Sequence, residues 1–231
     1  MQDGNVAEPG YPGTEYEEPR WHAALASLVA LALYITLPPK LTFGPYWLLP
    51  LLIFGTMVPL LILKPKRHNE SPLHRAVSIA HIAALNLFNV VSVVLLVIEL
   101  ANHAHSSVSG RTLLLSAGQI WLTNVIVYAL WFWEIDGDGP DVRAHAAGSA
   151  IDGRTDFLFP QSALPADVRA RLNWRPRFFD YVFLAFTNAT AFSPTDAFPL
   201  TQTAKVLMMG EALTSLVTIA VVAGRAVNIL S

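Results

Sequence analysis

The stretch Thr187–Asp196, TNATAFSPTD, places threonine and serine hydroxyl groups beside a single carboxylate. Hydroxyl, carbonyl and carboxylate oxygens are the ligands with which proteins replace the hydration shell of small cations. Pro194 interrupts regular helix within this stretch, because proline lacks a backbone N–H and fixes its own φ angle. These residue types are suited to the lining of a pore or a polar cavity.

Asp180 and Asp196 flank the short apolar segment 178–190 and offer one catalytic alternative. Two carboxylates could form an acid–base pair in an intramembrane hydrolase. The sequence supplies no nucleophile beside them and contains no H-E-x-x-H, G-x-S-x-G or glycine-rich phosphate-binding pattern. It also has no cysteine, which excludes thiolate catalysis and disulfides. We therefore expect no enzymatic activity, no bound metal and no cofactor.

Four further patterns have simpler structural interpretations. The acidic segment 134–141, EIDGDGPD, lacks the length and terminal glutamate of a calcium loop, so we expect a surface turn. We expect His81 to be a hydrogen-bonded core histidine rather than a proton sensor. His103 and His105 have no third metal ligand nearby and are typical of a solvated turn. The glycosylation sequon at Asn188 falls inside an expected helix, and we interpret it as a coincidence.

Composition indicates a membrane protein. The chain has 231 residues, of which 53% are hydrophobic and only 14% charged, whereas about 25% are charged in soluble domains. The net charge of −2 gives no basic footprint for a nucleic-acid partner. Residues 1–20 are acidic and rich in glycine and proline, which predicts a disordered tail and not a signal peptide.

The sequence predicts an all-α membrane protein with about five transmembrane helices. Each apolar stretch reaches or approaches the ~20 residues that a bilayer requires. We therefore expect the chain to cross a plasma membrane several times, with the lipid bilayer as one of its partners. The expected helices cover Trp21–Leu37, Gly44–Leu63, Leu73–Glu99, Thr112–Trp133 and Thr203–Leu230.

Between the fourth and fifth helices lie a long polar loop, 134–177, and the short apolar segment 178–190. A dozen apolar residues are too few to span a bilayer and favour a re-entrant helix. The irregular segment 191–196 follows it. Irregular backbone at membrane depth is tolerated only where protein buries it or where it lines water, so we expect this segment to face a pore or a polar cavity.

From Phe186 onward the spacing of several residues resembles the pore module of potassium channels. That module contains an outer helix, a turret, a short pore helix, a filter and an inner helix. The matching positions keep the family's spacing without a gap and are Phe186, Thr190, Asp196, Pro199, Thr201, Ala204, Lys205, Glu211 and Ala212. The chain end is also similar to that of an uncharacterised bacterial integral-membrane family, which implies a bacterial inner membrane.

The resemblance implies a division of the chain. Residues 21–110 would be scaffold helices, and 111–231 would be the channel-like module, with pore helix 178–190, filter-like segment 191–196 and inner helix 203–230. It further implies a homotetramer, with Thr214 and Thr218 lining an inner cavity and Glu211 bracing the pore loop.

The filter departs from the family pattern T-V-G-Y-G. This chain has Ala191, Phe192, Ser193, Pro194 and Thr195 there. The family's glycines permit unusual backbone angles that serine, proline and threonine disfavour, so potassium selectivity is not implied. Hydroxyl and carboxylate rings from Ser193, Thr195 and Asp196 would instead suit weakly selective passage of monovalent cations. Alternatively, Phe192 closes the path, and the chain is a non-conducting scaffold or a small-solute transporter.

The third and fourth helices carry polar faces that we expect to pack together through interhelical hydrogen bonds. Membrane orientation remains open at this stage. The channel resemblance places loop 134–177 outside, which also puts the basic segment 64–75 outside, against the positive-inside rule. Either one early helix does not cross, or the pore loop enters from the cytoplasmic side, or the charge bias is overridden.

Overall fold

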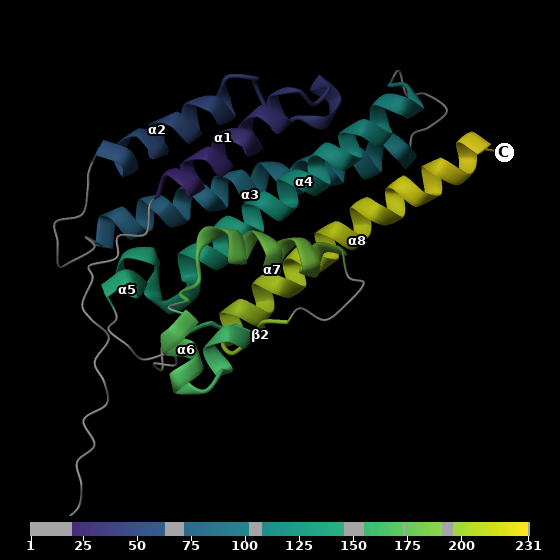
Figure 1. Ribbon diagram of the computed structural model, residues 1–231. Coiled ribbons are helices and arrows are strands. Elements are labelled where there is room, and N and C mark those ends of the chain that lie inside the picture. Colours follow the sequence, from purple (N-terminus) through teal and green to yellow (C-terminus); the bar gives the residue numbers. More distant parts are fainter. Residues whose placement is uncertain are drawn as a thin grey trace, which may run out of the picture.

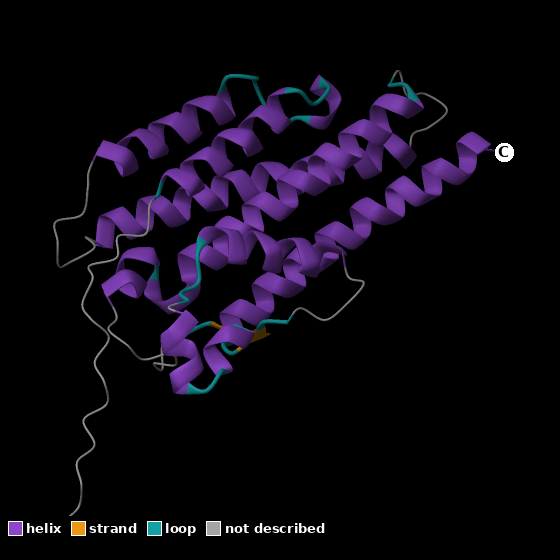
Figure 2. Ribbon diagram, in the orientation of Figure 1, coloured by secondary structure: helices purple, strands orange, loops and turns teal. Residues whose placement is uncertain are grey.

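The computed structural model describes residues 20–62, 72–101, 108–145, 155–172, 174–190 and 196–230. These residues form a mostly helical bundle (Figure 1). Long helices lie side by side, while short helices and a small strand gather near one end of the bundle (Figure 2). The expected, mostly helical character is therefore confirmed, although two short strands accompany the helices.

Three helices are long and apolar enough to cross a membrane: α3 (Pro72–Ala101), α4 (Gly110–Ile135) and α8 (Gln202–Leu230). Two further apolar helices, α1 (Trp21–Ile35) and α2 (Leu48–Ile62), have 15 residues each, fewer than the ~20 that a straight span needs. The structure is compatible with an integral membrane protein.

Helix α2 begins later than the sequence indicates. Gly44 has a φ angle of +73°, and Pro45 follows it directly, so the chain turns before the helix can start. The short 3₁₀ helix η1 (Pro39–Leu41) occupies part of the same connection. Pro59 lies inside α2.

Pairs of contacts define the direction of each helix. Ser27 and His81 meet between α1 and α3, and Tyr34 and Phe88 meet farther along both, so these helices are parallel. Asn89 of α3 bonds Asn124 of α4 near the middle of both helices, and α4 packs antiparallel to α3 and α8. The starts of α1, α3 and α8 and the end of α4 therefore share one end of the bundle, which we call the loop end.

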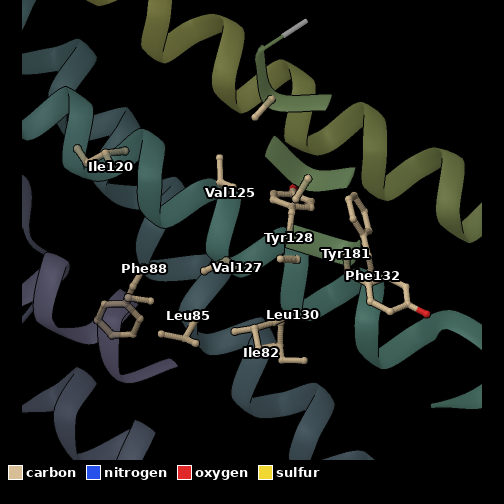
Figure 3. Packing of buried hydrophobic residues seen from close by; sticks show 14 of the residues in the cluster. Ile82, Leu85, Phe88, Ile120, Val125, Val127, Tyr128, Leu130, Phe132 and Tyr181 are labelled. Carbon is tan, nitrogen blue, oxygen red and sulfur yellow. The ribbon is translucent and has the colours of Figure 1, made fainter. Parts of the chain in front are cut away.

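The core lies mainly between α3, α4 and the helices that pack on α4. Figure 3 shows side chains from these helices facing one another, and they come from α3 (Ile82, Leu85, Phe88), α4 (Ile120, Val125, Val127, Tyr128, Leu130, Phe132) and α7 (Tyr181). Close packing of this kind, rather than hydrophobic burial, is what stabilises helix contacts within lipid.

The segment from α4 to α8 contains the remaining elements. They are η3 (Asp136–Asp138), α5 (Pro140–His145), β1 (Phe157–Leu158), η4 (Pro160–Ala163), α6 (Ala166–Leu172), α7 (Phe178–Thr190) and β2 (Phe198–Pro199). Strands β1 and β2 pair antiparallel, with Phe157 opposite Pro199 and Leu158 opposite Phe198. Helix α7 occupies the range expected for the short apolar helix.

The acidic segment after α4 is buried, so the expectation of a surface turn was wrong. Asp136 is 1% exposed, and Gly137 is also buried. Gly137, Asp138 and Gly139 all have positive φ angles, which glycine adopts freely and aspartate tolerates. The turn directs the Asp136 carboxylate inward, where backbone N–H groups of a distant segment meet it.

Helices α4 and α8 approach closely at Gly210. A Cβ atom built there would lie 2.8 Å from the hydroxyl oxygen of Tyr128, which belongs to a rigid ring that is only 4% exposed. We expect Gly210→Ala to lower the free energy of unfolding by about 1–3 kcal/mol, the usual cost of overpacking. Thermal unfolding in detergent micelles measures the change.

Gly118→Ala in α4 is the matched control. No atom lies within 4 Å of a Cβ atom added there, so the substitution should be neutral or stabilise the helix by up to about 1 kcal/mol. Equal effects of the two substitutions would contradict the close contact at Gly210.

Candidate functional site

The candidate site is the α7 hairpin, which we define as α7 together with the return to β2, residues 178–199. Its first end is fixed by Asp136. The Oδ2 atom of Asp136 accepts a hydrogen bond from the Tyr181 hydroxyl at 2.6 Å. The Oδ1 atom accepts backbone N–H groups from Asp156 at 2.8 Å and Phe157 at 3.2 Å. One buried carboxylate thus joins the end of α4, strand β1 and the start of α7.

The second end of the hairpin is fixed by Asp156. Its backbone carbonyl accepts the N–H of Leu200 at 2.8 Å, and its carboxylate accepts the Thr201 hydroxyl. The Thr201 oxygen in turn accepts the N–H of Ala204 at 3.2 Å, as an N-cap of α8 does. Burial raises the pKa of the Asp156 carboxyl, and the Thr201 hydrogen bond opposes that rise.

Both ends of the α7 hairpin therefore lie at the loop end of the bundle, although α7 itself extends away from it. Tyr181 lies near Asp136, whereas Asn188, two turns later, contacts α8 at Met208 and Glu211. Thirteen residues of helix extend about 20 Å. The chain enters along α7 and returns to the end from which it started.

Asn188 holds the inner part of α7 against α8. Its side-chain amide donates to the carbonyl of Met208 at 2.9 Å and to Oε2 of Glu211 at 2.7 Å. Glu211 is fully buried. The pairing places Glu211 of α8 against α7.

The network continues through Asn124 of α4. The Asn124 side chain donates to the carbonyl of Glu211 at 3.3 Å and to the Ser215 hydroxyl at 2.9 Å. Its carbonyl oxygen accepts from Asn89 of α3 at 3.3 Å. Amide side chains thereby link α3, α4, α8 and α7 in one buried chain of hydrogen bonds, which restricts how these helices slide.

His81 bonds its neighbours on both sides. One ring nitrogen lies 3.0 Å from the Ser27 hydroxyl and the other 2.6 Å from the Thr56 hydroxyl. It thus joins α1, α2 and α3. This is the hydrogen-bonded core histidine that the sequence favours.

The structure describes only some of the other residues expected at the site. The Thr190 hydroxyl donates to the carbonyl of Thr187 at 2.9 Å, so it closes the last turn of α7. The hydroxyls of Thr214 and Thr218 donate at 2.8 Å to carbonyls of α8 itself. Ala191, Phe192, Ser193, Pro194 and Thr195 lie outside the described residues, as do His103 and His105.

A cavity of about 80 Å³ lies between η4 and α7. Asp180 and Asp196 both line it, so the fold brings together the two carboxylates that flank α7. Thr187 also lines it, but its hydroxyl donates to carbonyls of α7. Within the described ranges, no group of three or more acidic or histidine side chains is arranged to hold a metal ion.

The residues that hold the hairpin were not identified from the sequence. Asn188 was interpreted as a chance sequon, and Asp136 as part of a surface turn. No role was predicted for Tyr181 or Asp156. An asparagine inside a short apolar helix was the available signal, because polar side chains in such helices usually face protein partners.

Comparison of the chain with protein-family models, with curated proteins and with solved structures finds no match. Function is therefore inferred from the geometry of the site.

Asp136→Asn tests the fixed end of the hairpin. The amide cannot supply the charged acceptors that now serve two backbone N–H groups and a tyrosine hydroxyl, and such bonds contribute about 1.5–3 kcal/mol. We expect the free energy of unfolding to fall by about 2 kcal/mol, measured by thermal unfolding in micelles.

Asp138→Asn is the control for the same turn. Asp138 pairs with Arg75 at 3.3 Å, but its side chain is 47% exposed, and asparagine tolerates its positive φ angle. We expect a loss below about 1 kcal/mol. An equal loss for both variants would mean that the Asp136 carboxylate has no special role.

Proposed function

We propose that this chain is a subunit of a channel-like membrane pore. In this proposal five helices cross the bilayer, and the α7 hairpin is re-entrant between the fourth and the last. Four copies surround the path, and small monovalent cations pass with weak selectivity along the segment 190–196. The proposal extends the resemblance of residues 178–230 to potassium-channel pore modules.

The position of the two hairpin ends is the observation that carries the proposal. At the loop end, Tyr181 bonds the Asp136 carboxylate, and Leu200 and Thr201, directly after the hairpin, bond the carbonyl and the carboxylate of Asp156. The Asn188–Glu211 contact lies deep in the bundle. Glu211 is nine residues from the start of α8, or about 14 Å along its axis. This is near the middle of a ~30 Å hydrocarbon layer. Thr190, the last residue of α7, would then lie near the depth at which a pore filter is required.

The exposed surface of α8 supports assembly into an oligomer. In the apolar stretch of α8 only 22% of the residues are buried, whereas 61% are buried in the apolar stretch of α4. The outward side chains are Val206, Met209, Leu213, Leu216 and Ile219. In a tetramer the inner helix would contact a neighbouring copy and the central path, and lipid would cover the remainder.

Charge distribution supports one of the open orientations. Arginines collect at the loop end, where the structure describes Arg20, Arg75, Arg143, Arg171, Arg175 and Arg177. Among the basic side chains that the structure describes, Lys40 and Arg111 lie at the opposite end. Basic residues in short connections favour the cytoplasm. We therefore place the loop end inside the cell, so that the hairpin enters from the cytoplasmic side, opposite to potassium channels.

A non-conducting scaffold or small-solute transporter is the second candidate. The hydroxyls of Thr214 and Thr218 bond α8 itself, and Thr218 is 1% exposed. Such an arrangement favours a closed interior over an open cavity. The two functions differ in whether cations cross the membrane unaided.

Cation flux into liposomes containing the purified protein tests conduction. We expect potassium and sodium to enter with little preference. Asn188→Ala removes the contact with Glu211 and should reduce flux roughly threefold, the equivalent of an average membrane hydrogen bond of ~0.6 kcal/mol. Thr187→Ala on the same helix should leave flux unchanged, because that hydroxyl bonds its own helix.

Phe192→Ala completes this experiment. Flux only in that variant would identify Phe192 as the gate. Absence of flux in every variant would count against a pore and favour the scaffold or transporter.

Single cysteines test the orientation, because the natural chain has none to interfere. Tyr46, which is 88% exposed, lies between η1 and α2 at the end opposite the loop end. We expect an impermeant maleimide to label Tyr46→Cys in intact cells and Ala163→Cys in η4 only after the membrane is opened. The reverse pattern would restore the orientation of potassium channels.

A further inference from the structure

Glu211 of α8 is the acidic side chain that contacts the inner part of the proposed hairpin, at Asn188. Its side chain is fully buried. Oε2 accepts one hydrogen bond, from Asn188 at 2.7 Å, and Oε1 has no hydrogen-bond partner in the part of the chain that the structure describes.

The groups around Glu211 that the structure describes are neutral. Helix α7 contributes Asn188, and α4 contributes Asn124 and Tyr128. The Tyr128 hydroxyl also contacts the side chains of Asn86 of α3 and Thr214 of α8. Tyr128 is the one titratable neighbour among the described residues, and no lysine, arginine or histidine there bonds the carboxyl group.

Glu134 of α4 provides a contrast within the same molecule. It is 1% exposed and also has one carboxylate oxygen without a hydrogen-bond partner among the described residues. However, Ser78 bonds it, and the charges of Arg20, Arg75 and Arg143 act on it. A buried carboxylate is tolerated where cations compensate it. Three cations act on Glu134, whereas none that the structure describes bonds Glu211.

An ionised carboxylate with a single amide donor and no cation is strongly disfavoured in a low-dielectric interior, and such groups take up a proton instead. We infer that Glu211 is an intramembrane proton-binding site at the contact of α7 with α8, and that it is occupied at neutral pH. The neutral carboxyl accepts the Asn188 amide through its carbonyl oxygen Oε2, and the proton resides on Oε1.

This inference rests on the proposed hairpin but not on ion conduction. Loss of the proton leaves a charge that the surrounding amides and hydroxyls cannot neutralise. Water or a cation must then enter between α7 and α8, which moves the hairpin. Protonation of Glu211 thereby couples the position of α7 to pH.

Infrared spectroscopy of the full chain in lipid tests the inference, because a protonated carboxyl group has a C=O stretching band separate from the amide bands. At neutral pH we expect the wild-type spectrum to contain such a band that is missing from Glu211→Gln and retained in Glu134→Gln.

Asn188→Ala gives a second measurement with the carboxyl group in place. The carbonyl loses its donor, so the band should move to higher frequency. Absence of a Glu211 band at neutral pH, or a band unaffected by Glu211→Gln and by Asn188→Ala, would overturn the inference. Since the band is recorded without ion flux, its presence in a non-conducting protein would separate the failure of the pore from the failure of the proton site.

Discussion

The buried carboxylate of Asp136 is the interaction on which the loop end of this protein depends. It accepts hydrogen bonds from Tyr181 and from two backbone N–H groups of the β1 segment. Buried backbone donors require partners, and strand β1 is too short to satisfy its own. Strand β1 then positions β2 and, through Asp156, the start of α8. The geometry of the hairpin follows from this one side chain.

The interior of the bundle relies on amide side chains rather than ion pairs. Asn89, Asn124 and Asn188 bond across four helices and leave no net charge within the apolar region. Within lipid each such bond contributes modestly, but a network of them specifies one register between helices that apolar packing alone would allow to slide. A re-entrant hairpin needs this specification, because a helix of 13 residues has little surface with which to hold its place.

The charged pairs that the structure describes lie at the bundle ends. At the loop end Arg20 pairs with Asp141 and Arg75 with Asp138, which joins the starts of α1 and α3 to the turn after α4. At the opposite end Lys40 pairs with Glu99 at 3.3 Å. These partly exposed pairs add little stability individually. The loop end has more described arginines than the opposite end has described basic residues, and this difference supports the proposed orientation.

The positions of the helices could be predicted from the sequence alone, because length, apolar composition and proline placement are local properties of the chain. The sequence located α7 at 178–190 and misplaced the start of α2 only where Gly44 turns the backbone. Tertiary structure decided the partners of Asp136 and Asn188, which lie 45 and 23 residues away in Tyr181 and Glu211. Hydrogen bonds between distant residues depend on how the helices pack, and no local pattern specifies that packing.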